Sequence, residues 1–265
     1  MTSKKEDMAK ARNYVLYYGH GREEELSSYD LAVVEPSGHD TDSIQRLKDN
    51  GTLVLAYISV MEIQIWSQEF GLLKDNDFLE VNGQKLMNCD YGTYIMDLTS
   101  DRWRSLLLHK AGQLLVLFGY DGLFLDTIGD VEMPAIPAHI QTIQMSAAVD
   151  LLGILRKIFP DSLIIQNNGL EKLCLHTADL IDGICWENPP FAKKESITWA
   201  ESIVMRLETL KTSRSLSILL LTEVNSDTAT IKNSELCSRI SSEKGFLFYC
   251  APEGYINGIN LPNNM

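Results

Sequence analysis

The sequence contains few of the residues that mark a metal site, a disulfide framework or a membrane span. Its five cysteines are an odd number with no CxxC pair, and its five histidines show neither HxH nor HExxH spacing. These patterns predict no zinc site and no disulfide framework. No apolar run approaches the roughly 20 residues that span a bilayer. We therefore expect no metal, no cofactor and no membrane span.

Cationic residues are also scarce. The chain has 23 Lys and Arg against 36 Asp and Glu, which gives a net charge of -13. Phosphate backbones are repelled by such a protein, so no nucleic-acid partner is expected. The acidic surface favours cationic partners and steers them toward a cleft, although the same charge also serves solubility alone.

The first ten residues are charged and include no apolar signal segment. The chain as given is therefore expected to be cytoplasmic, or to be an exported protein, secreted or at the cell surface, whose leader has been removed.

Strand-like and helix-like segments alternate along the 265 residues, of which 45% are hydrophobic. Continuous apolar strands separated by helices predict a parallel sheet covered by helices. Eight such units in ~250 residues predict a (β/α)₈ TIM barrel, here a single domain over residues 1–265. A doubly wound open sheet is the alternative, but no GxGxxG follows the first strand. The expected strands are 13–18, 29–35, 52–60, 119–126, 162–168, 183–187, 216–224 and 245–251. The expected helices are 41–50, 101–118, 140–159, 170–176, 195–213 and 228–241.

An insertion of about forty residues, roughly 61–100, follows the third predicted strand. Its Asn82-Gly83 pair is a strong signal for a β-hairpin, and an extended piece is expected at 93–98. Loops that follow barrel strands lie on the catalytic face, so we expect this insertion to shape a substrate cleft.

Acids stand at or just beyond the ends of five predicted strands: Glu35, Glu62, Asp126, Glu187 and Glu223. The count alone is weak evidence, because 36 acids in 265 residues would place one near about three of eight strand ends by chance. The context is more informative, since Asp126 directly follows a buried apolar run, where a carboxylate without partners is costly.

A pair of carboxylates is what glycosidic cleavage requires. One protonates the leaving oxygen, while the other attacks the anomeric carbon or activates water. We predict Asp126 as the nucleophile or base and Glu187 as the general acid/base. The adjacent Trp186 would supply an apolar wall that raises the pKa of Glu187.

Aromatic and amide side chains gather near the same predicted strand ends, as sugar rings and hydroxyls require. Tyr57 and Tyr249 are expected to belong to the core instead. The predicted substrate-binding residues are Tyr18, Glu62, Trp66, Asn168, Trp186 and Glu223.

Four segments together resemble glycoside hydrolase family 114: AYISV at 56–60, GYDGLFLD at 119–126, QNNG at 166–169 and WEN at 186–188. The resemblance implies a (β/α)₈ barrel with endo-α-1,4-polygalactosaminidase activity, no metal, and Asp126 and Glu187 as the catalytic pair. Members are typically exported, and a partly deacetylated galactosamine polymer is cationic, which suits the acidic chain. The family often has a glycine where Met61 precedes Glu62 here.

Two other functions remain open from the sequence. One is a carbohydrate-binding barrel without catalysis. The other is a carbohydrate deacetylase or amidase, which commonly uses a metal or an activated nucleophile. The scattered histidines and the absence of GxSxG argue against the second.

Overall fold

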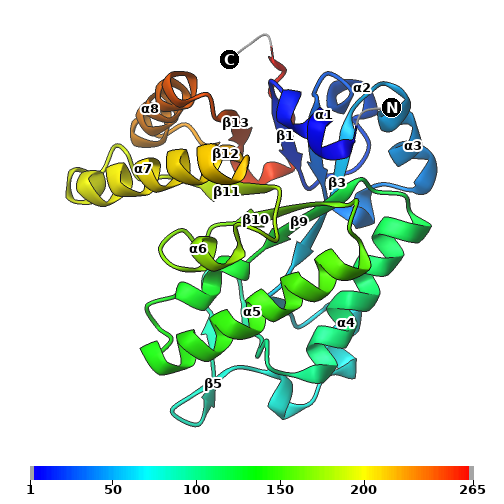
Figure 1. The fold of residues 1–265 in the computed structure, drawn as a ribbon, viewed down its shortest axis with the longest axis vertical. Coiled ribbons are helices and arrows are strands. Elements are labelled where there is room, and N and C mark those ends of the chain that lie inside the picture. Colours follow the sequence, from blue (N-terminus) through cyan, green and yellow to red (C-terminus); the bar gives the residue numbers. More distant parts are fainter. Residues whose placement is uncertain (1–2, 263–265) are drawn as a thin grey trace.

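The computed structural model describes residues 3–262 and places eight parallel strands in one sheet that is wound into a barrel (Figure 1). The sheet order is β1-β2-β3-β9-β10-β11-β12-β13, and each neighbouring pair is parallel. The predicted barrel is confirmed, with strand bounds close to those expected. The strands are β1 (Tyr14–Tyr17), β2 (Leu31–Val34), β3 (Leu53–Ser59), β9 (Gly122–Asp126), β10 (Leu163–Asn167), β11 (Gly183–Glu187), β12 (Ser217–Val224) and β13 (Leu247–Pro252).

Helices cover the outside of the sheet (Figure 1). They are α1 (Lys4–Lys10), α2 (Glu23–Leu26), α3 (Thr41–Asp49), α4 (Asp101–Gly112), α5 (Ala138–Ile158), α6 (Leu173–Thr177), α7 (Ile197–Arg214) and α8 (Thr228–Lys244). The helix predicted over 101–118 changes character after Gly112, where one π-helical turn, η4 (Gln113–Leu117), completes it. Within the described residues, no helix has the length and apolar character needed to cross a membrane.

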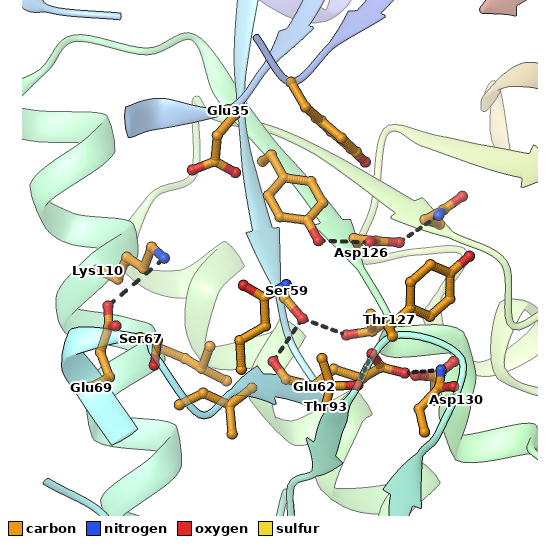
Figure 2. Close-up of a pocket in the computed structure, with 18 of the residues that line it drawn as sticks. Glu35, Ser59, Glu62, Ser67, Glu69, Thr93, Lys110, Asp126, Thr127 and Asp130 are labelled. Carbon is orange, nitrogen blue, oxygen red and sulfur yellow. Dashed lines mark hydrogen bonds and ion pairs between the residues drawn. The ribbon is translucent and has the colours of Figure 1, made fainter. Parts of the chain in front are cut away.

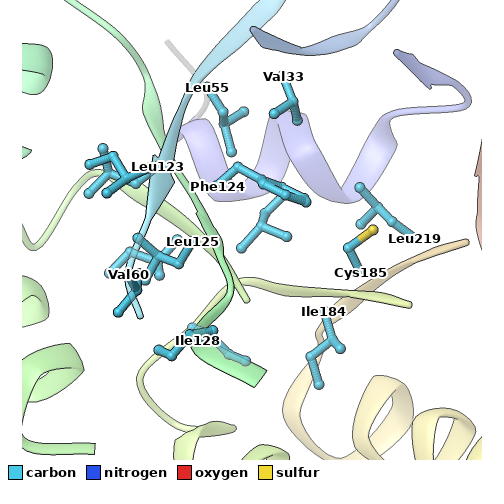
Figure 3. Packing of buried hydrophobic residues seen from close by; sticks show 14 of the residues in the cluster. Val33, Leu55, Val60, Leu123, Phe124, Leu125, Ile128, Ile184, Cys185 and Leu219 are labelled. Carbon is cyan, nitrogen blue, oxygen red and sulfur yellow. The ribbon is translucent and has the colours of Figure 1, made fainter. Parts of the chain in front are cut away.

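Most of the strands are buried on both faces, as continuous apolar runs predict. All four residues of β1 and of β2 and all five of β10 are buried. Side chains such as Val33, Leu55 and Phe124 pack together in the core (Figure 3). Burying apolar area of this kind contributes about 25 cal/mol per Å² and is the main source of the barrel's stability.

The two edge strands, β1 and β13, lie side by side, but no backbone ladder joins them in the described part of the chain. Tyrosine side chains fill this seam. The ring of Tyr249 lies 6.0 Å from that of Tyr14 and 5.9 Å from that of Tyr29. The Tyr14 hydroxyl donates to the Leu220 carbonyl at 2.8 Å. The barrel is therefore closed here by side chains.

Buried acids at the amino ends of the strands are paired with cations. Asp121, just before β9, lies 3.3 Å from Lys4 of α1 and 3.1 Å from Lys48 of α3. Asp182, just before β11, lies 2.6 Å from Arg156 of α5. Removing one partner of such a pair leaves a costly uncompensated charge, so these acids have a structural role.

The insertion after β3 forms two small antiparallel sheets. In one, β5 (Glu80–Val81) pairs with β6 (Gln84–Lys85) through Asn82 and Gly83, whose φ values of +55° and +76° suit a type I′ turn. The other sheet contains β4 (Glu62–Gln64), β7 (Met87–Asn88) and β8 (Thr93–Ile95). Short helical turns complete the chain: η1 (Pro36–Gly38), η2 (Gln68–Leu72), η3 (Asp75–Asp77), η5 (Ile128–Glu132), η6 (Lys194–Ser196) and η7 (Glu253–Tyr255).

Candidate active site

A cleft of about 900 Å³ opens at the carboxyl ends of the barrel strands. This is the face on which barrel enzymes carry their chemistry, and the volume is that of a ligand site. The insertion forms one wall of the cleft (Figure 2). The lining side chains at or just after the eight strand ends are Tyr18, Glu35, Ser59, Asp126, Asn167, Glu187, Glu223 and Tyr255.

The structure brings Asp126 and Glu187 together and joins them through Asn167. The amide nitrogen of Asn167 donates to Oδ1 of Asp126 at 2.6 Å and to Oε2 of Glu187 at 2.9 Å. Because one nitrogen reaches both, these two oxygens lie at most about 5.5 Å apart. The sequence predicted both acids, but it named Asn168 and not Asn167 as the amide that binds the substrate.

Each carboxylate also accepts a hydrogen bond from a tyrosine. Tyr57 donates to Oδ2 of Asp126 at 2.9 Å, and Tyr255 donates to Oε1 of Glu187 at 2.7 Å. The ring of Tyr18 lies between the two, 4.8 Å from Tyr57 and 5.4 Å from Tyr255. All four carboxylate oxygens of the pair therefore have a protein donor.

These contacts correct the prediction that Tyr57 belongs to the core. Its side chain is only partly buried and lines the cleft. The apolar run of β3 concealed this, because an inward-pointing residue at the carboxyl end of a barrel strand faces the cleft instead of the packed interior. Tyr249 is fully buried, as predicted.

The two carboxyl groups have shifted pKa values. Burial raises the pKa of Asp126, while the hydrogen bonds from Asn167 and Tyr57 oppose that shift. Burial also raises the pKa of Glu187, and the nearby charge of Asp126 raises it further. Perturbed carboxyl groups in a cleft are typical of catalytic sites.

Thr127 fixes the chain immediately after Asp126. Its backbone is left-handed, with φ of +58°. Its hydroxyl oxygen accepts from the amides of Val60 at 3.0 Å and Met61 at 2.8 Å and lies 3.1 Å from the Ser59 hydroxyl (Figure 2). Left-handed conformations of non-glycine residues cost free energy and gather at functional sites. The turn therefore ends β9 abruptly, with the Asp126 carboxyl at the rim.

Two further acids of the cleft, Glu62 and Asp130, lie near Asp126 (Figure 2). Glu62 accepts from the Asn88 amide at 2.8 Å and from the Thr93 hydroxyl at 2.6 Å. Burial, and after it the charges of Glu62 and Asp126, raise the pKa of Asp130 to about 8. Its Oδ2 atom is buried, with no hydrogen-bond partner among the described residues. Asp130 was not among the predicted site residues, because the sequence alone does not distinguish a loop acid that lines a cleft from one that is exposed to solvent.

Three further predicted residues also line the cleft. Glu223 accepts a hydrogen bond from the Gly254 amide. Asn168 has a left-handed backbone, and its side-chain oxygen accepts from the Glu187 amide at 3.1 Å, so it orders the end of β11. Trp66 lies on the insertion, with 69% of its surface exposed.

Trp186 lies outside the lining of the cleft. It is buried, and its ring packs against Phe191 at 5.2 Å and Trp199 of α7 at 5.8 Å. Side chains alternate along a strand, so Trp186 faces the helices while its neighbour Glu187 faces the cleft. The prediction that the Trp186 ring forms an apolar wall beside the Glu187 carboxyl group is therefore wrong.

Negative charge dominates the lining. Within the part of the chain that the structure describes, the one lysine in the lining is Lys110, which lies 3.9 Å from Glu69. No group of three or more His, Cys, Asp or Glu residues among those described is placed to hold a metal ion. The acids in the lining are Glu35, Glu62, Glu69, Asp126, Asp130, Glu187 and Glu223.

Comparison with known families gives a match to glycoside-hydrolase family GH114 over residues 2–188, more than half of the chain. The chain belongs to this family. As a member, the protein is a glycoside hydrolase. No curated protein matches the sequence.

Solved structures share the fold at low sequence identity. The glycoside hydrolase domain of PelA from Pseudomonas aeruginosa is 20% identical, with a TM-score of 0.74 over 92% of this chain and 96% of that one. Ega3 from Aspergillus fumigatus, in complex with galactosamine, is 11% identical, with a TM-score of 0.72 over 98% of both chains. The α-galactosidase TtGalA from Thermus thermophilus is 13% identical, with a TM-score of 0.61 over 98% of this chain and 67% of that one.

Proposed function

We propose that this glycoside hydrolase acts as a single-domain enzyme that cleaves α-1,4-linked galactosamine-containing polysaccharide within the chain. Asp126 is the nucleophile and Glu187 the general acid/base. The observation that carries the proposal is the pair of carboxyl groups joined by Asn167 at the carboxyl ends of the strands.

The spacing of the pair supports a retaining mechanism. Retaining glycosidases hold their carboxyl groups ~5–5.5 Å apart, whereas inverting enzymes need ~6.5–9.5 Å for a water. The facing oxygens here lie at most about 5.5 Å apart. Asp126 would attack the anomeric carbon while Glu187 protonates the leaving oxygen, and Glu187 would then take a proton from the water that releases the sugar. So short a separation is also evidence against a barrel that only binds sugars.

The surroundings of the two acids support the division of roles. Asp126 accepts hydrogen bonds from Asn167, Tyr57 and the backbone amide of Thr127, which favour its ionised form. Glu187 lies beside that negative charge, which favours its protonated form. Such a difference between two carboxyl groups separates nucleophile from acid.

The charge of the cleft supports an amino-sugar substrate. Among residues 3–262, seven acids and one lysine line the cleft, and that lysine lies 3.9 Å from Glu69. Ammonium groups of a partly deacetylated galactosamine polymer would offset this charge at close range. The solved complex of Ega3 with galactosamine is consistent with the same substrate class.

Residues around the pair would hold the sugar units. We assign this role to Tyr18, Glu62, Asn168 and Glu223, which line the cleft, and to the exposed ring of Trp66 at its rim. An aromatic face at the rim stacks on sugar rings away from the scissile bond. Contacts beyond the cleaved unit suit an enzyme that binds several units and cuts within the chain.

The test is hydrolysis of partly deacetylated α-1,4-galactosamine polymer, followed by mass spectrometry of the products. The wild type should release oligosaccharides. Asp126→Asn and Glu187→Gln, which preserve shape, should each lower the rate by about 10²- to 10⁴-fold. Full activity in either variant would overturn the assigned roles. If the wild type releases no product, the proposed substrate is wrong.

A further inference from the structure

Tyr255 occupies a part of the chain that the family match does not reach. It ends η7, directly after β13, whereas the match to GH114 ends at residue 188. Glu187 is the last acid of the cleft within the matched segment. The contact between these two residues therefore joins the matched segment to the remainder of the barrel.

The backbone around Tyr255 turns sharply back into the cleft. Gly254 and Tyr255 have φ values of +74° and +56°. The Tyr255 carbonyl accepts from the Tyr18 amide at 3.0 Å, and the Gly254 amide donates to Glu223. A positive φ is uncommon for an aromatic residue and costs of order 1 kcal/mol, so it persists only where surrounding contacts fix it.

The side chain of Tyr255 completes the hydrogen bonding of Glu187. Its hydroxyl holds Oε1 at 2.7 Å while Asn167 holds Oε2 at 2.9 Å. Its ring packs against Tyr18 at 5.4 Å. The carboxyl plane of Glu187 is therefore fixed from both ends.

We propose that Tyr255 is a positioning residue that orients the Glu187 carboxyl group for proton transfer to and from the substrate. The proposal rests on the proposed function, in which Glu187 is the acid/base. A general acid must aim its proton at the leaving oxygen within hydrogen-bond reach. A glutamate with three side-chain torsions is held in that orientation only by partners at its oxygens.

Tyr255 also acts on the charge of Glu187. Burial and the negative charge of Glu187 raise the pKa of Tyr255 above its ordinary value, so its hydroxyl remains a donor at neutral pH. That donor lowers the pKa of Glu187 against burial and Asp126. Other titratable groups also face Glu187. They are the acids Asp126 on β9, Asp130 on η5 and Glu223 on β12, the tyrosines Tyr14 on β1, Tyr18 just after β1, Tyr57 on β3 and Tyr91 on the insertion, and the thiol of Cys185 on β11.

Tyr255→Phe separates the hydroxyl from the ring, since phenylalanine retains the packing on Tyr18. In protein labelled with ¹³C at glutamate Cδ, NMR should show the pKa of Glu187 rising by about one unit. The Glu187→Gln variant assigns the resonance. An unchanged titration of Glu187 in Tyr255→Phe overturns the proposal, and this measurement requires no substrate.

Kinetics on the polymer give the second readout. Loss of a hydrogen bond to a charged group should lower kcat about 10- to 100-fold. The alkaline limb of the pH–rate profile should move to higher pH, because the protonated form of Glu187 persists to higher pH. Tyr120→Phe is the matched control, because that buried hydroxyl has no hydrogen-bond partner in the described residues and its removal should leave kcat and the limb unchanged.

The two proposals fail in different ways. If the wild type cleaves the polymer and Tyr255→Phe has the same kcat and pH profile, positioning by Tyr255 is overturned while the function stands. If the wild type does not cleave the polymer, the proposed function is overturned. The NMR titration still decides whether the Tyr255 hydroxyl sets the pKa of Glu187. A drop in Tm without a shift in either pKa readout would assign Tyr255 a purely structural role and overturn the proposal.

Discussion

The hydroxyl of Tyr57 donates to Oδ2 of Asp126 over 2.9 Å, from the neighbouring strand of the barrel. Strands β3 and β9 pair so that Tyr57 is level with Phe124, two residues before Asp126. The long tyrosine side chain covers that offset and meets the carboxylate at the rim. Strand register therefore sets the environment of the proposed nucleophile.

Tyr57→Phe should weaken the nucleophile. Without this donor, the pKa of Asp126, already raised by burial, should rise further. Since the nucleophile must be ionised, the acid limb of kcat/KM should move to higher pH, and kcat/KM at the optimum should fall about 10-fold. Rate measurements on the polymer across pH check this, and an acid limb identical to that of the wild type would contradict it.

Asp130 should make stability depend on pH. Its folded pKa of about 8 lies above its unfolded value of about 3.9. Its contribution to stability is therefore fully present below pH ~4 and is lost as pH rises through about 8. In Asp130→Asn the fall in Tm over this window should be smaller than in the wild type, by several degrees. Asp150→Asn, an exposed acid on α5, is the control and should retain the wild-type slope.

Trp66→Ala should weaken substrate binding without affecting the fold. The ring is 69% exposed, so its removal leaves no cavity in the core. Loss of stacking on a sugar ring should raise KM about 3- to 10-fold, with kcat nearly unchanged. Steady-state kinetics and thermal melts test this together. Val116→Ala, equally exposed and outside the cleft lining, should leave KM unchanged.

Gly129→Ala should disturb the contact between the loops after β9 and β10. A Cβ atom at residue 129 would lie 2.5 Å from the Gly169 amide nitrogen and 2.8 Å from Cβ of Asn168. Relieving that overlap requires a backbone shift and should cost about 1–3 kcal/mol. It should also lower activity, because Asn167 lies on the displaced segment.

A second glycine, Gly153, serves as the matched control, and its replacement by alanine should increase stability. Gly153 lies within α5, and apart from its own helix turn no atom of the described residues lies within 4 Å of an added Cβ. Gly153→Ala should raise stability by about 0.5–1 kcal/mol through helix propensity alone. Denaturant unfolding of both variants checks the pair, and a stable Gly129→Ala would contradict the close packing of the two loops.

The barrel and its main acids could be predicted because they depend on local patterns. Continuous apolar runs such as residues 162–168 identify parallel strands, and an acid that follows such a run is placed at the rim by the strand itself. For the same reason Asp126 and Glu187 were predicted together, although they lie on strands separated by β10.

The partners of these acids could not be predicted, because they depend on which way each side chain points. Asn167 ends β10 and Asn168 follows it directly. Only the fold shows that the Asn167 side chain reaches both acids while the Asn168 side chain accepts from the backbone amide of Glu187. Trp186 is next to Glu187 in sequence but on the opposite face of the strand. Tyr255 lies beyond the last strand, where no periodic pattern positions a side chain.

The tyrosine-filled seam between β1 and β13 has a consequence for how the barrel opens. Amide hydrogens that face this seam are not protected by a ladder, so they should exchange with solvent faster than those of β9 to β11. The hydrogen bond from the Tyr18 amide to the Tyr255 carbonyl is a backbone link across this seam at the cleft end of the barrel. Local breathing of the barrel would thus begin beside the proposed acid/base, and bound sugar should slow it.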